Sequence, residues 1–543
     1  MQRLSEIYIG TEIYSELKTT ETICFFCREM TFFVPVFIIV CVLRNGLFVN
    51  SDPSSKPYYT AAVFEHNRFG SMNDTADDII QTNLEFYRKA AEVAKSKEAD
   101  IIVFPEYGII PPRDRKAIRV YLEDIPDPVQ ADINPCTEKE RFAKHPILRG
   151  FSCIAQFHSI FVVGNMGDIK NCDIEYDCPS DGAFHFNTNV VFDRNGTMLL
   201  KYHKEHLFFE TGMNPAREQP DPIFETDFGT FATFTCFDIL FGKMSKIAHL
   251  PFVDGIVFPT FWVNTNPQFT SVQLWMSWSL GHNTTLMASN IQLPGEYSMG
   301  SGIFHGQFGP LAYTLNPDGK SKLVVARVPR SGYPFIPSDS SVTEITLEKT
   351  RKATFDGKDI RKMCSTYVLD YPDDANKDYR CMEEFTTYYN LVKLTEPSGY
   401  VEACHNGMCC SVDYSAENMK DNFYLGVYNG THNSLDRYFW CEENCVIMRC
   451  EAIDDNPCAV FPRLSKTDFY KLVLRTNFTS NHIYPSVVST AVRLVPLSQW
   501  NYARSPTETG YEAEINFNNK KGRSLIVAGL KGRCYDRDPS FEK

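Results

Sequence analysis

The sequence predicts an α/β fold, in which a layered domain with a two-sheet core is followed by a second, mostly β domain. Strand and helix patterns alternate from about residue 57 to 330, and the run at 101–104 is apolar at every position. A strand that is covered on both faces of a sheet reads as such a continuous apolar run. After about residue 381, cysteines and aromatic residues become dense. The length of 543 residues also exceeds that of one ordinary domain.

The elements of the first domain follow one another in a regular order. Residues 58–65 are expected to form a strand, and Thr75 begins a capping signal for a helix that ends near Lys97. A hairpin is predicted around residues 193–196, because Asn-Gly supplies the positive φ angles of a tight turn. Further strands are expected at 231–235, 253–258, 286–291 and 302–304, with a helix from Pro267 to about His282.

The second domain is predicted to span residues 381–543 and to consist of short strands stapled by disulfides. Seven cysteines lie between positions 404 and 458, and turn signals such as Asn429-Gly430 recur. Zinc binding is the rival interpretation, but a zinc site would need regular CxxC pairs, which this stretch lacks. The first domain is predicted to span residues 57–335. Residues 336–380 are expected to be a loop-rich connection between the two domains.

Residues 1–51 are predicted to be a leader. The apolar run at 31–43 has the length of a signal-peptide core and is short for a membrane span. Met30 directly precedes this run, so residues 1–29 are interpreted as an upstream extension. An uncleaved signal anchor is the competing interpretation. No lipid-anchor signal is recognised, and no stable membrane span is expected.

Cysteine number and glycosylation signals also indicate export. Of the 18 cysteines, Cys24, Cys27 and Cys41 lie in the leader, which leaves an odd number and predicts one free thiol. Cys172 and Cys178 flank a short polar loop and are expected to pair with each other. Disulfides persist in oxidising compartments, so we predict an extracellular protein. The glycosylation sequons are at Asn73, Asn195, Asn283, Asn429 and Asn477.

The charge balance excludes one class of partner. The formal net charge is −13, and no run of lysine or arginine stands out. Nucleic-acid binding needs a basic face, so a nucleic-acid partner is not expected. The acidity favours solubility and does not identify a substrate.

Three reactive residues each follow a predicted strand, which is where open α/β sheets build their sites. Glu106 follows the run at 101–104, and partial desolvation would bring its pKa closer to that of a general base. Lys204 follows the hairpin and could stabilise an oxyanion. Cys236 follows a strand, and a helix start with a nearby lysine would lower its thiol pKa. Taken singly, such residues are more often surface groups or a buried structural thiol.

Together with their surroundings, these residues resemble the biotinidase–vanin branch of the nitrilase superfamily over about residues 58–535. The segments that carry the resemblance are IIVFPEYGI, FNTNVVF, KYHKEHLFFE, FGTFATFTCFDILF and IVFPTFWVN. The resemblance implies a nitrilase-like α-β-β-α sandwich and a hydrolase of linear amides that needs neither a metal nor an organic cofactor. It implies that Glu106 is the general base and then acid, and that Cys236 is the nucleophile that forms a thioester. Lys204, with a backbone N–H near Phe237, would stabilise the oxyanion.

Five neighbouring residues are secondary candidates. Trp262 and Asn264 follow the strand after Cys236 and are expected at the same rim, as substrate-binding residues. Glu210 is expected either to orient Lys204 or to contact substrate, with a plain surface role as the alternative. Tyr107 stands where family members often carry an acidic residue, which removes a charge beside Glu106 and leaves substrate preference open. Asp238 is interpreted either as a further site residue or as a cap for the turn after Cys236.

Three functions remain in competition at this point. The first is cleavage of pantetheine to pantothenate and cysteamine, which the KYH word before Lys204 favours weakly. The second is the same chemistry on biotin amides. The third is an inactive secreted relative whose β domain binds a partner, although the intact trio argues against it. The expected partner is a small-molecule amide, and the oligomeric state stays open.

Overall fold

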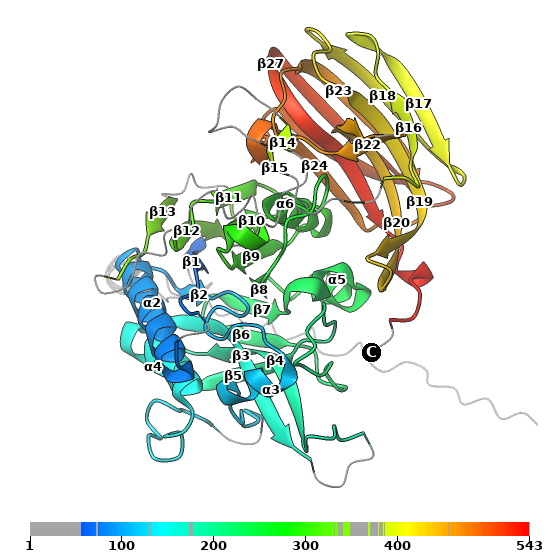
Figure 1. Cartoon of the computed structure of the whole chain (residues 1–543). Coiled ribbons are helices and arrows are strands. Elements are labelled where there is room, and N and C mark those ends of the chain that lie inside the picture. The colour runs from blue at the N-terminus through cyan, green and yellow to red at the C-terminus, as the bar shows by residue number, and fades with distance from the viewer. Residues whose placement is uncertain are drawn as a thin grey trace, which may run out of the picture. The chain divides into compact units, whose positions relative to one another are not determined.

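Two stacked β-sheets form the core of the first domain (Figure 1). The first sheet has the strand order β13-β12-β1-β2-β3-β4-β5, and the second has the order β11-β10-β9-β8-β7-β6. Apolar side chains such as Val63, Val103 and Val257 fill the space between the two sheets. The strands are β1 (Tyr58–Glu65), β2 (Ile101–Val103), β3 (Phe161–Asn171), β4 (Ala183–Phe192), β5 (Met198–His203), β6 (Ile223–Thr226), β7 (Gly229–Thr233), β8 (Gly255–Thr260), β9 (Thr285–Asn290), β10 (Ser301–His305), β11 (Gly309–Thr314), β12 (Lys322–Pro329) and β13 (Ser341–Glu344).

The computed structural model describes most of the chain from residue 56 to 541. The predicted leader at 1–51 and the sequon at Asn73 lie outside the described residues. The other gaps are 72, 130–131, 173–176, 331, 335–339, 348–367, 370–377, 380–383, 385 and 454. In the part that is described, no helix has both the length and the apolar character needed to cross a membrane.

Helices cover the outer faces of both sheets and complete an α-β-β-α sandwich. Figure 1 shows α2 and α4 side by side, and their apolar faces pack with Ile102 and Phe104 of the first sheet. The side chain of Thr75 accepts a hydrogen bond from the Asp78 backbone and caps α2, as predicted. The predicted fold class is therefore confirmed. The helices are α2 (Ala76–Ser96), α3 (Arg115–Ile118), α4 (Pro146–His158), α5 (Gly242–Ala248) and α6 (Ser271–His282).

Helix α6 is buried on nearly every side. It lies between the second sheet and strand β24 (Ile483–Ser489) of the C-terminal domain, so two layers cover it. A helix that is buried all round needs no polar stripe, which explains its mostly apolar sequence with Trp275 and Trp278 fully buried. The helix begins at Ser271, slightly later than the predicted start at Pro267.

The C-terminal domain is a large antiparallel sheet with the order β16-β19-β20-β27-β23-β18-β17. Strand β27 is long enough to pair with β23 and β26 in its first part and with β20 and β24 in its second. The strands are β16 (Asn390–Lys393), β17 (Ser398–His405), β18 (Met408–Ala416), β19 (Phe423–Ser434), β20 (Tyr438–Arg449), β23 (Asp468–Phe478), β25 (Arg493–Leu494), β26 (Trp500–Pro506) and β27 (Tyr511–Arg533), with small pairs β14 (Val368–Leu369), β15 (Asp378–Tyr379) and β21 (Glu451–Ile453), β22 (Asn456–Val460).

One local prediction about the C-terminal domain was wrong. Asn429-Gly430 is not a turn but lies inside β19, opposite Glu443 and Glu442 of β20. The chain reverses later, at Leu435 and Asp436, which both have positive φ angles. Within the predicted connection at 336–380, β13 pairs with β12 and extends the first sheet. The domain boundaries themselves stay predictions.

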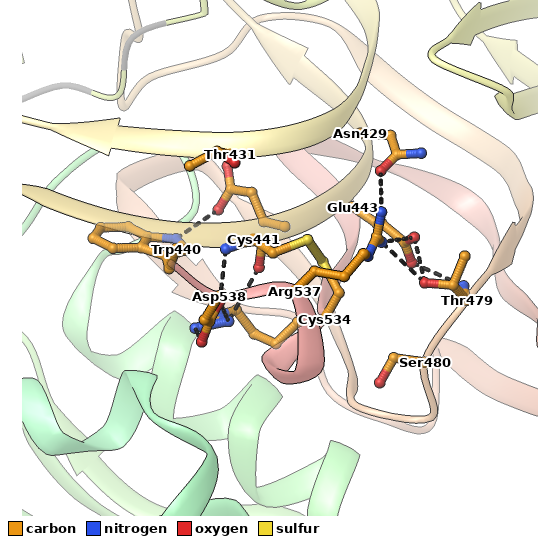
Figure 2. The surroundings of a disulfide bond; sticks show 12 residues. Asn429, Thr431, Trp440, Cys441, Glu443, Thr479, Ser480, Cys534, Arg537 and Asp538 are labelled. Atoms are coloured by element: carbon orange, nitrogen blue, oxygen red, sulfur yellow. Dashed lines mark hydrogen bonds and ion pairs between the residues drawn. A yellow bond between two sulfur atoms is a disulfide. The ribbon is translucent and has the colours of Figure 1, made fainter. Parts of the chain in front are cut away.

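Disulfides tie the C-terminal domain together, as predicted. Figure 2 shows the bridge between Cys441 and Cys534, beside which Arg537 forms an ion pair of 2.6 Å with Glu443. This arrangement holds the segment after β27 against β20. Among the described cysteines, Cys236 alone is free, which agrees with the predicted single thiol. The bridges are Cys136–Cys153, Cys172–Cys178, Cys404–Cys409, Cys410–Cys445, Cys441–Cys534 and Cys450–Cys458.

The two domains contact each other directly and belong to one compact unit, residues 56–543. The guanidinium of Arg533 donates a hydrogen bond of 2.7 Å to the carbonyl of Leu240, close behind Cys236 in the sequence. The hydroxyl of Tyr438 accepts one of 2.8 Å from the Phe209 backbone. The C-terminal domain therefore contacts the segments that follow β7 and β5 of the first domain, at Leu240 and Phe209.

Candidate active site

One pocket brings together the three residues that the sequence singles out. Glu106 lies just after β2, Lys204 directly follows β5, and Cys236 is the first residue of a short 3-10 helix after β7. These strands come from both sheets and end at the same edge. All three residues line a pocket of about 420 Å³. The prediction that they share a site therefore agrees with their placement, although their chemical roles remain a prediction.

The ammonium group of Lys204 is held between two carboxylates. Its Nζ lies 2.8 Å from Oε1 of Glu106 and 2.6 Å from Oε2 of Glu210. Desolvation alone would lower the pKa of Lys204, but the charges of Glu106 and Glu210 outweigh it and raise the pKa well above its usual value. These contacts therefore favour the charged form of Lys204.

Glu106 is fixed through both of its carboxylate oxygens. Besides Lys204, Oε1 accepts a hydrogen bond of 2.7 Å from the side-chain amide of Asn187. Oε2 accepts one of 2.7 Å from the backbone N–H of Phe261, which follows β8. Desolvation raises the pKa of Glu106, Lys204 opposes that effect, and Glu210 adds to it. The direction of this shift is the one expected of a general base near neutral pH.

A row of asparagines behind Glu106 was missed in the sequence. On the paired strands β3 and β4, the Asn165 amide donates to the side chains of Asn187 (2.6 Å) and Asn189 (3.0 Å). Asn189 in turn donates to Thr233 on β7, the strand that leads to Cys236. The alternating asparagines in FNTNVVF, within an otherwise apolar strand, were the signal that could have revealed this buried polar row.

The thiol of Cys236 is buried and unactivated in the resting state. Cys236 is 6% exposed, and its Sγ lies 3.5 Å from the carbonyl oxygen of Phe261. Burial raises the pKa of the Cys236 thiol, Glu106 raises it further, and Lys204 opposes both. The predicted lowering of this pKa was wrong, because burial of the thiol is the largest effect and the charge of Glu106 offsets that of Lys204. In addition, only one short 3-10 turn follows Cys236.

The backbone of Cys236 adopts an unusual conformation that the neighbouring residues support. Its φ angle is 47°, in the left-handed region that non-glycine residues rarely occupy. Thr235 and Asp238 form a capping box around it, and Asp238 also accepts a hydrogen bond from the Tyr202 hydroxyl (2.9 Å). Asp238 is thus a structural cap that holds the turn, in agreement with the cap interpretation.

Glu210 and Tyr107 lie against the trio. Glu210 lines the pocket and contacts Lys204, so the prediction that it orients this lysine agrees with its position. The hydroxyl of Tyr107 donates a hydrogen bond of 2.9 Å to Oε1 of Glu210, and its backbone N–H donates to Asn165. Tyr107, which stands where family members often carry an acidic residue, is therefore a neutral phenol that is hydrogen-bonded to the carboxylate of Glu210.

The structure does not bring Trp262 and Asn264 to this pocket. The Trp262 indole N–H donates 2.8 Å to the carbonyl of Phe269 in the core, and the Asn264 amide donates 2.8 Å to that of Tyr297. Their neighbours Phe261 and Val263 line the pocket instead. Because side chains alternate along an extended chain, Phe261 and Val263 face the pocket where Trp262 and Asn264 were expected.

A second, larger pocket adjoins the first and includes residues from the C-terminal domain. Its volume is about 720 Å³, and it shares Phe209, Glu210 and Thr211 with the pocket of Cys236. Arg437 and Tyr438, at the reversal between β19 and β20, form its other wall. No pattern in the sequence indicated that the C-terminal domain approaches the site.

Comparisons with known proteins agree with these observations. The family model for carbon–nitrogen hydrolases matches residues 71–286, and that for the vanin C-terminal domain matches residues 379–538. The chain is 31% identical to the pantetheinase of Homo sapiens, with 94% of each chain covered. It is 30% identical to the biotinidase of Bos taurus, covering 90% of this chain and 94% of the relative. Among solved structures, an amidase from Nesterenkonia sp. matches at 18% identity and a TM-score of 0.38, covering 50% of this chain and 92% of that one.

Proposed function

Because this chain belongs to the carbon–nitrogen hydrolase family that includes pantetheinases and biotinidases, we propose that it cleaves a linear amide through a thioester on Cys236. The observation that carries the proposal is the shared pocket. The free thiol of Cys236 lines it together with Lys204, whose ammonium group binds Glu106 and Glu210. The enzyme is a hydrolase of carbon–nitrogen bonds other than peptide bonds. The roles of individual residues and the substrate are the proposal.

Acylation begins with transfer of the Cys236 thiol proton to Glu106. Oε2 of Glu106 accepts a hydrogen bond from Phe261 and keeps a lone pair for that proton. The thiolate attacks the amide carbon, a C–S bond forms, and negative charge collects on the amide oxygen. Lys204 stabilises this oxyanion, together with the backbone N–H of Phe237. Glu106 then returns the proton to the nitrogen, so that the C–N bond breaks and the amine leaves.

Deacylation repeats these steps with water as the nucleophile. Glu106, ionised again, takes a proton from water, which attacks the thioester carbon. The tetrahedral intermediate collapses, the C–S bond breaks, and the acid product leaves. Glu106 returns the proton to Cys236. Because burial raises the pKa of the Cys236 thiol in the resting enzyme, deprotonation by Glu106 is a required step.

Pantetheine is the proposed substrate. Both adjoining pockets suit a long, linear molecule whose amide lies at Cys236 and whose far end lies along Phe209 and Tyr438. Biotin amides are the alternative, since a biotinidase is similar to this chain over nearly the same length. Purified enzyme is to be incubated with pantetheine and, separately, with a biotinyl amide while the released amine is measured. Faster release of cysteamine supports the proposal, whereas exclusive cleavage of the biotinyl amide rejects it.

Export from the cell is a separate part of the proposal. Disulfides among the described cysteines support it, as does the exposure of Asn195, Asn283 and Asn477 at three sequons. Asn429 is less accessible, because its side-chain amide donates a hydrogen bond of 2.9 Å to the Asn406 carbonyl. We keep residues 1–51 as the leader, and 57–335 and 381–543 as the two domains. Endoglycosidase treatment of culture medium is expected to increase gel mobility, and an unchanged band in both medium and lysate would contradict export.

A further inference from the structure

Three histidines converge where the two domains meet, outside the pocket of Cys236. His249 caps the end of α5, His282 is the last residue of α6, and His482 directly precedes β24. One ring nitrogen from each lies within 4.8 Å of the others. His249 is exposed, His282 is buried, and His482 is half-buried. The cluster therefore combines a fixed interior ligand with an open side.

We propose that these three imidazoles bind a divalent transition metal ion of the zinc type. Nε2 of His249 lies 3.4 Å from Nδ1 of His282. Two nitrogen ligands on a tetrahedral zinc ion are about 3.3 Å apart, given Zn–N distances of about 2.0–2.1 Å. The ring centres are 4.6, 5.6 and 6.0 Å apart, and three imidazoles on one zinc ion would place theirs at about 5 Å. A small inward movement of His482 would complete the set.

The outer hydrogen bonds of the rings point their lone pairs toward the centre. Nδ1 of His249 lies 2.8 Å from the Ser245 carbonyl, which can only accept, so Nδ1 carries the proton and Nε2 has a free lone pair. Nε2 of His282 contacts the Tyr484 hydroxyl (3.1 Å), and Nδ1 of His482 contacts the Ser245 hydroxyl (3.0 Å). Carbonyl and hydroxyl partners of this kind orient imidazoles that bind metals.

The charges around the cluster are partly balanced. Arg504 and Arg533 place positive charge near His482, and Asp536 offsets part of it. An all-imidazole set favours zinc and excludes magnesium or calcium, which require oxygen ligands.

An ion at this position would join three elements that the chain brings together from far apart. It would fasten α5 and α6 of the first domain to the loop before β24. A pocket of about 290 Å³, lined by His249, His282 and His305, leaves room for water as a fourth ligand. The competing explanation is a direct hydrogen bond from Nδ1–H of His282 to Nε2 of His249, which needs no metal.

Zinc titration of untagged, full-length enzyme distinguishes these explanations. The protein is first dialysed against a chelator and then titrated with ZnCl₂ alone in a calorimeter, with MgCl₂ as a parallel titrant. We expect one saturable zinc site per chain, no heat from magnesium, and a melting temperature that rises by a few degrees with zinc. Replacement of zinc by Co²⁺ is expected to give the visible absorption of a tetrahedral site.

Matched histidine variants locate the ion. His249→Asn and His482→Gln replace accessible ligands with little risk to folding, and each is expected to weaken zinc binding at least tenfold and to abolish the temperature rise. His305→Asn serves as the control, because His305 lines the same pocket but is not one of the three convergent rings. Absence of saturable binding, or equal binding by all three variants, would overturn the proposal.

Discussion

Among the residues that the structure describes, two buried clusters each place a lysine between two glutamates. In the first domain, Lys204 contacts Glu106 and Glu210. In the C-terminal domain, Nζ of Lys531 lies 2.7 Å from Glu442 and 3.7 Å from Glu384. An asparagine donates to a glutamate in each cluster, so their chemical composition is nearly the same.

Their surroundings differ in ways that decide what each can do. The Lys204 cluster borders a pocket that also contains a free thiol, whereas the ammonium of Lys531 packs over the ring of Phe269 at 4.0 Å. Every cysteine described in the C-terminal domain is in a disulfide. Buried Lys–Glu pairs are thus no signature of catalysis by themselves, because access and a nucleophile are also required.

The pKa values of Glu106 and Glu442 are shifted in opposite directions. Desolvation raises the pKa of Glu106, and this effect prevails over Lys204. Desolvation acts on Glu442 too, but Lys531 and His432 overcome it and hold the pKa of Glu442 well below its usual value. Desolvation also raises the pKa of Glu384, the second carboxylate beside Lys531, so a raised carboxylate pKa does not by itself mark a catalytic base.

Removal of the nucleophile gives the largest expected effect. Cys236→Ala should lower the rate of amide hydrolysis by at least about 10⁴-fold, since no thioester can form. Glu106→Gln should instead trap an intermediate: with an activated ester, acylation does not need protonation of the leaving group, while deacylation lacks its base. Intact-protein mass spectrometry should therefore detect an acyl adduct in Glu106→Gln and none in Cys236→Ala. An adduct on Cys236→Ala would place the nucleophile elsewhere.

Matched lysine variants test the contrast between the clusters most directly. Lys204→Met should lower kcat of the folded protein by about 10²–10³-fold, because it removes an oxyanion donor. It should also lower Tm, because Glu106 and Glu210 are left buried without their partner. Lys531→Met should leave kcat/KM nearly unchanged but destabilise the fold by about 3–5 kcal/mol, because Glu442 is left buried without its partner. Activity assays and thermal unfolding of both variants provide the measurement. Loss of activity in a folded Lys531→Met variant would contradict the expectation that only the Lys204 cluster takes part in catalysis.

The pH profile tests whether Glu210 tunes Glu106. The charge of Glu210 raises the pKa of Glu106, so Glu210→Gln should lower that pKa and move the acidic limb of kcat/KM to lower pH. The maximal rate should fall by about tenfold, since Lys204 loses a charged hydrogen bond. A change confined to the height of the profile, with the limb unmoved, would reduce Glu210 to a purely structural role.

The smallest effect is expected at Tyr107. Tyr107→Phe removes one neutral-to-charged hydrogen bond to Glu210 and leaves the backbone contact with Asn165 intact. We expect kcat/KM to fall by about threefold, with Tm nearly unchanged. Steady-state kinetics on pantetheine give the comparison, and a loss beyond about 10²-fold would mean that the phenol itself contacts substrate.

The layers of the first domain and the meeting of the trio could be predicted from the sequence. The capping signal at Thr75 and the apolar run at 101–104 are local patterns that tertiary contacts did not override. Glu106, Lys204 and Cys236 each follow a strand, and strand ends meet at the edge of a layered sheet. Strand-end position places such residues near one another, and the resemblance to the nitrilase superfamily selected these three.

Features that depend on long-range packing could not be predicted. The thiol pKa of Cys236 results from burial by residues of both sheets, which no local pattern reports. Asn429-Gly430 reads as a turn, yet pairing with β20 keeps it extended. The choice of Phe261 over Trp262 at the rim depends on the register in which the chain leaves β8.

The burial of Cys236 has a consequence for how the protein matures. Thiol–disulfide exchange proceeds through the thiolate, so a thiol with a raised pKa in a closed environment reacts slowly with other disulfides. Twelve described cysteines must find their partners during oxidative folding while this one stays reduced. Once the second sheet has formed around the turn at Cys236, its buried sulfur can be reached only through the pocket and competes less for the other cysteines. The same low reactivity that makes the resting nucleophile depend on its base protects it from mispairing.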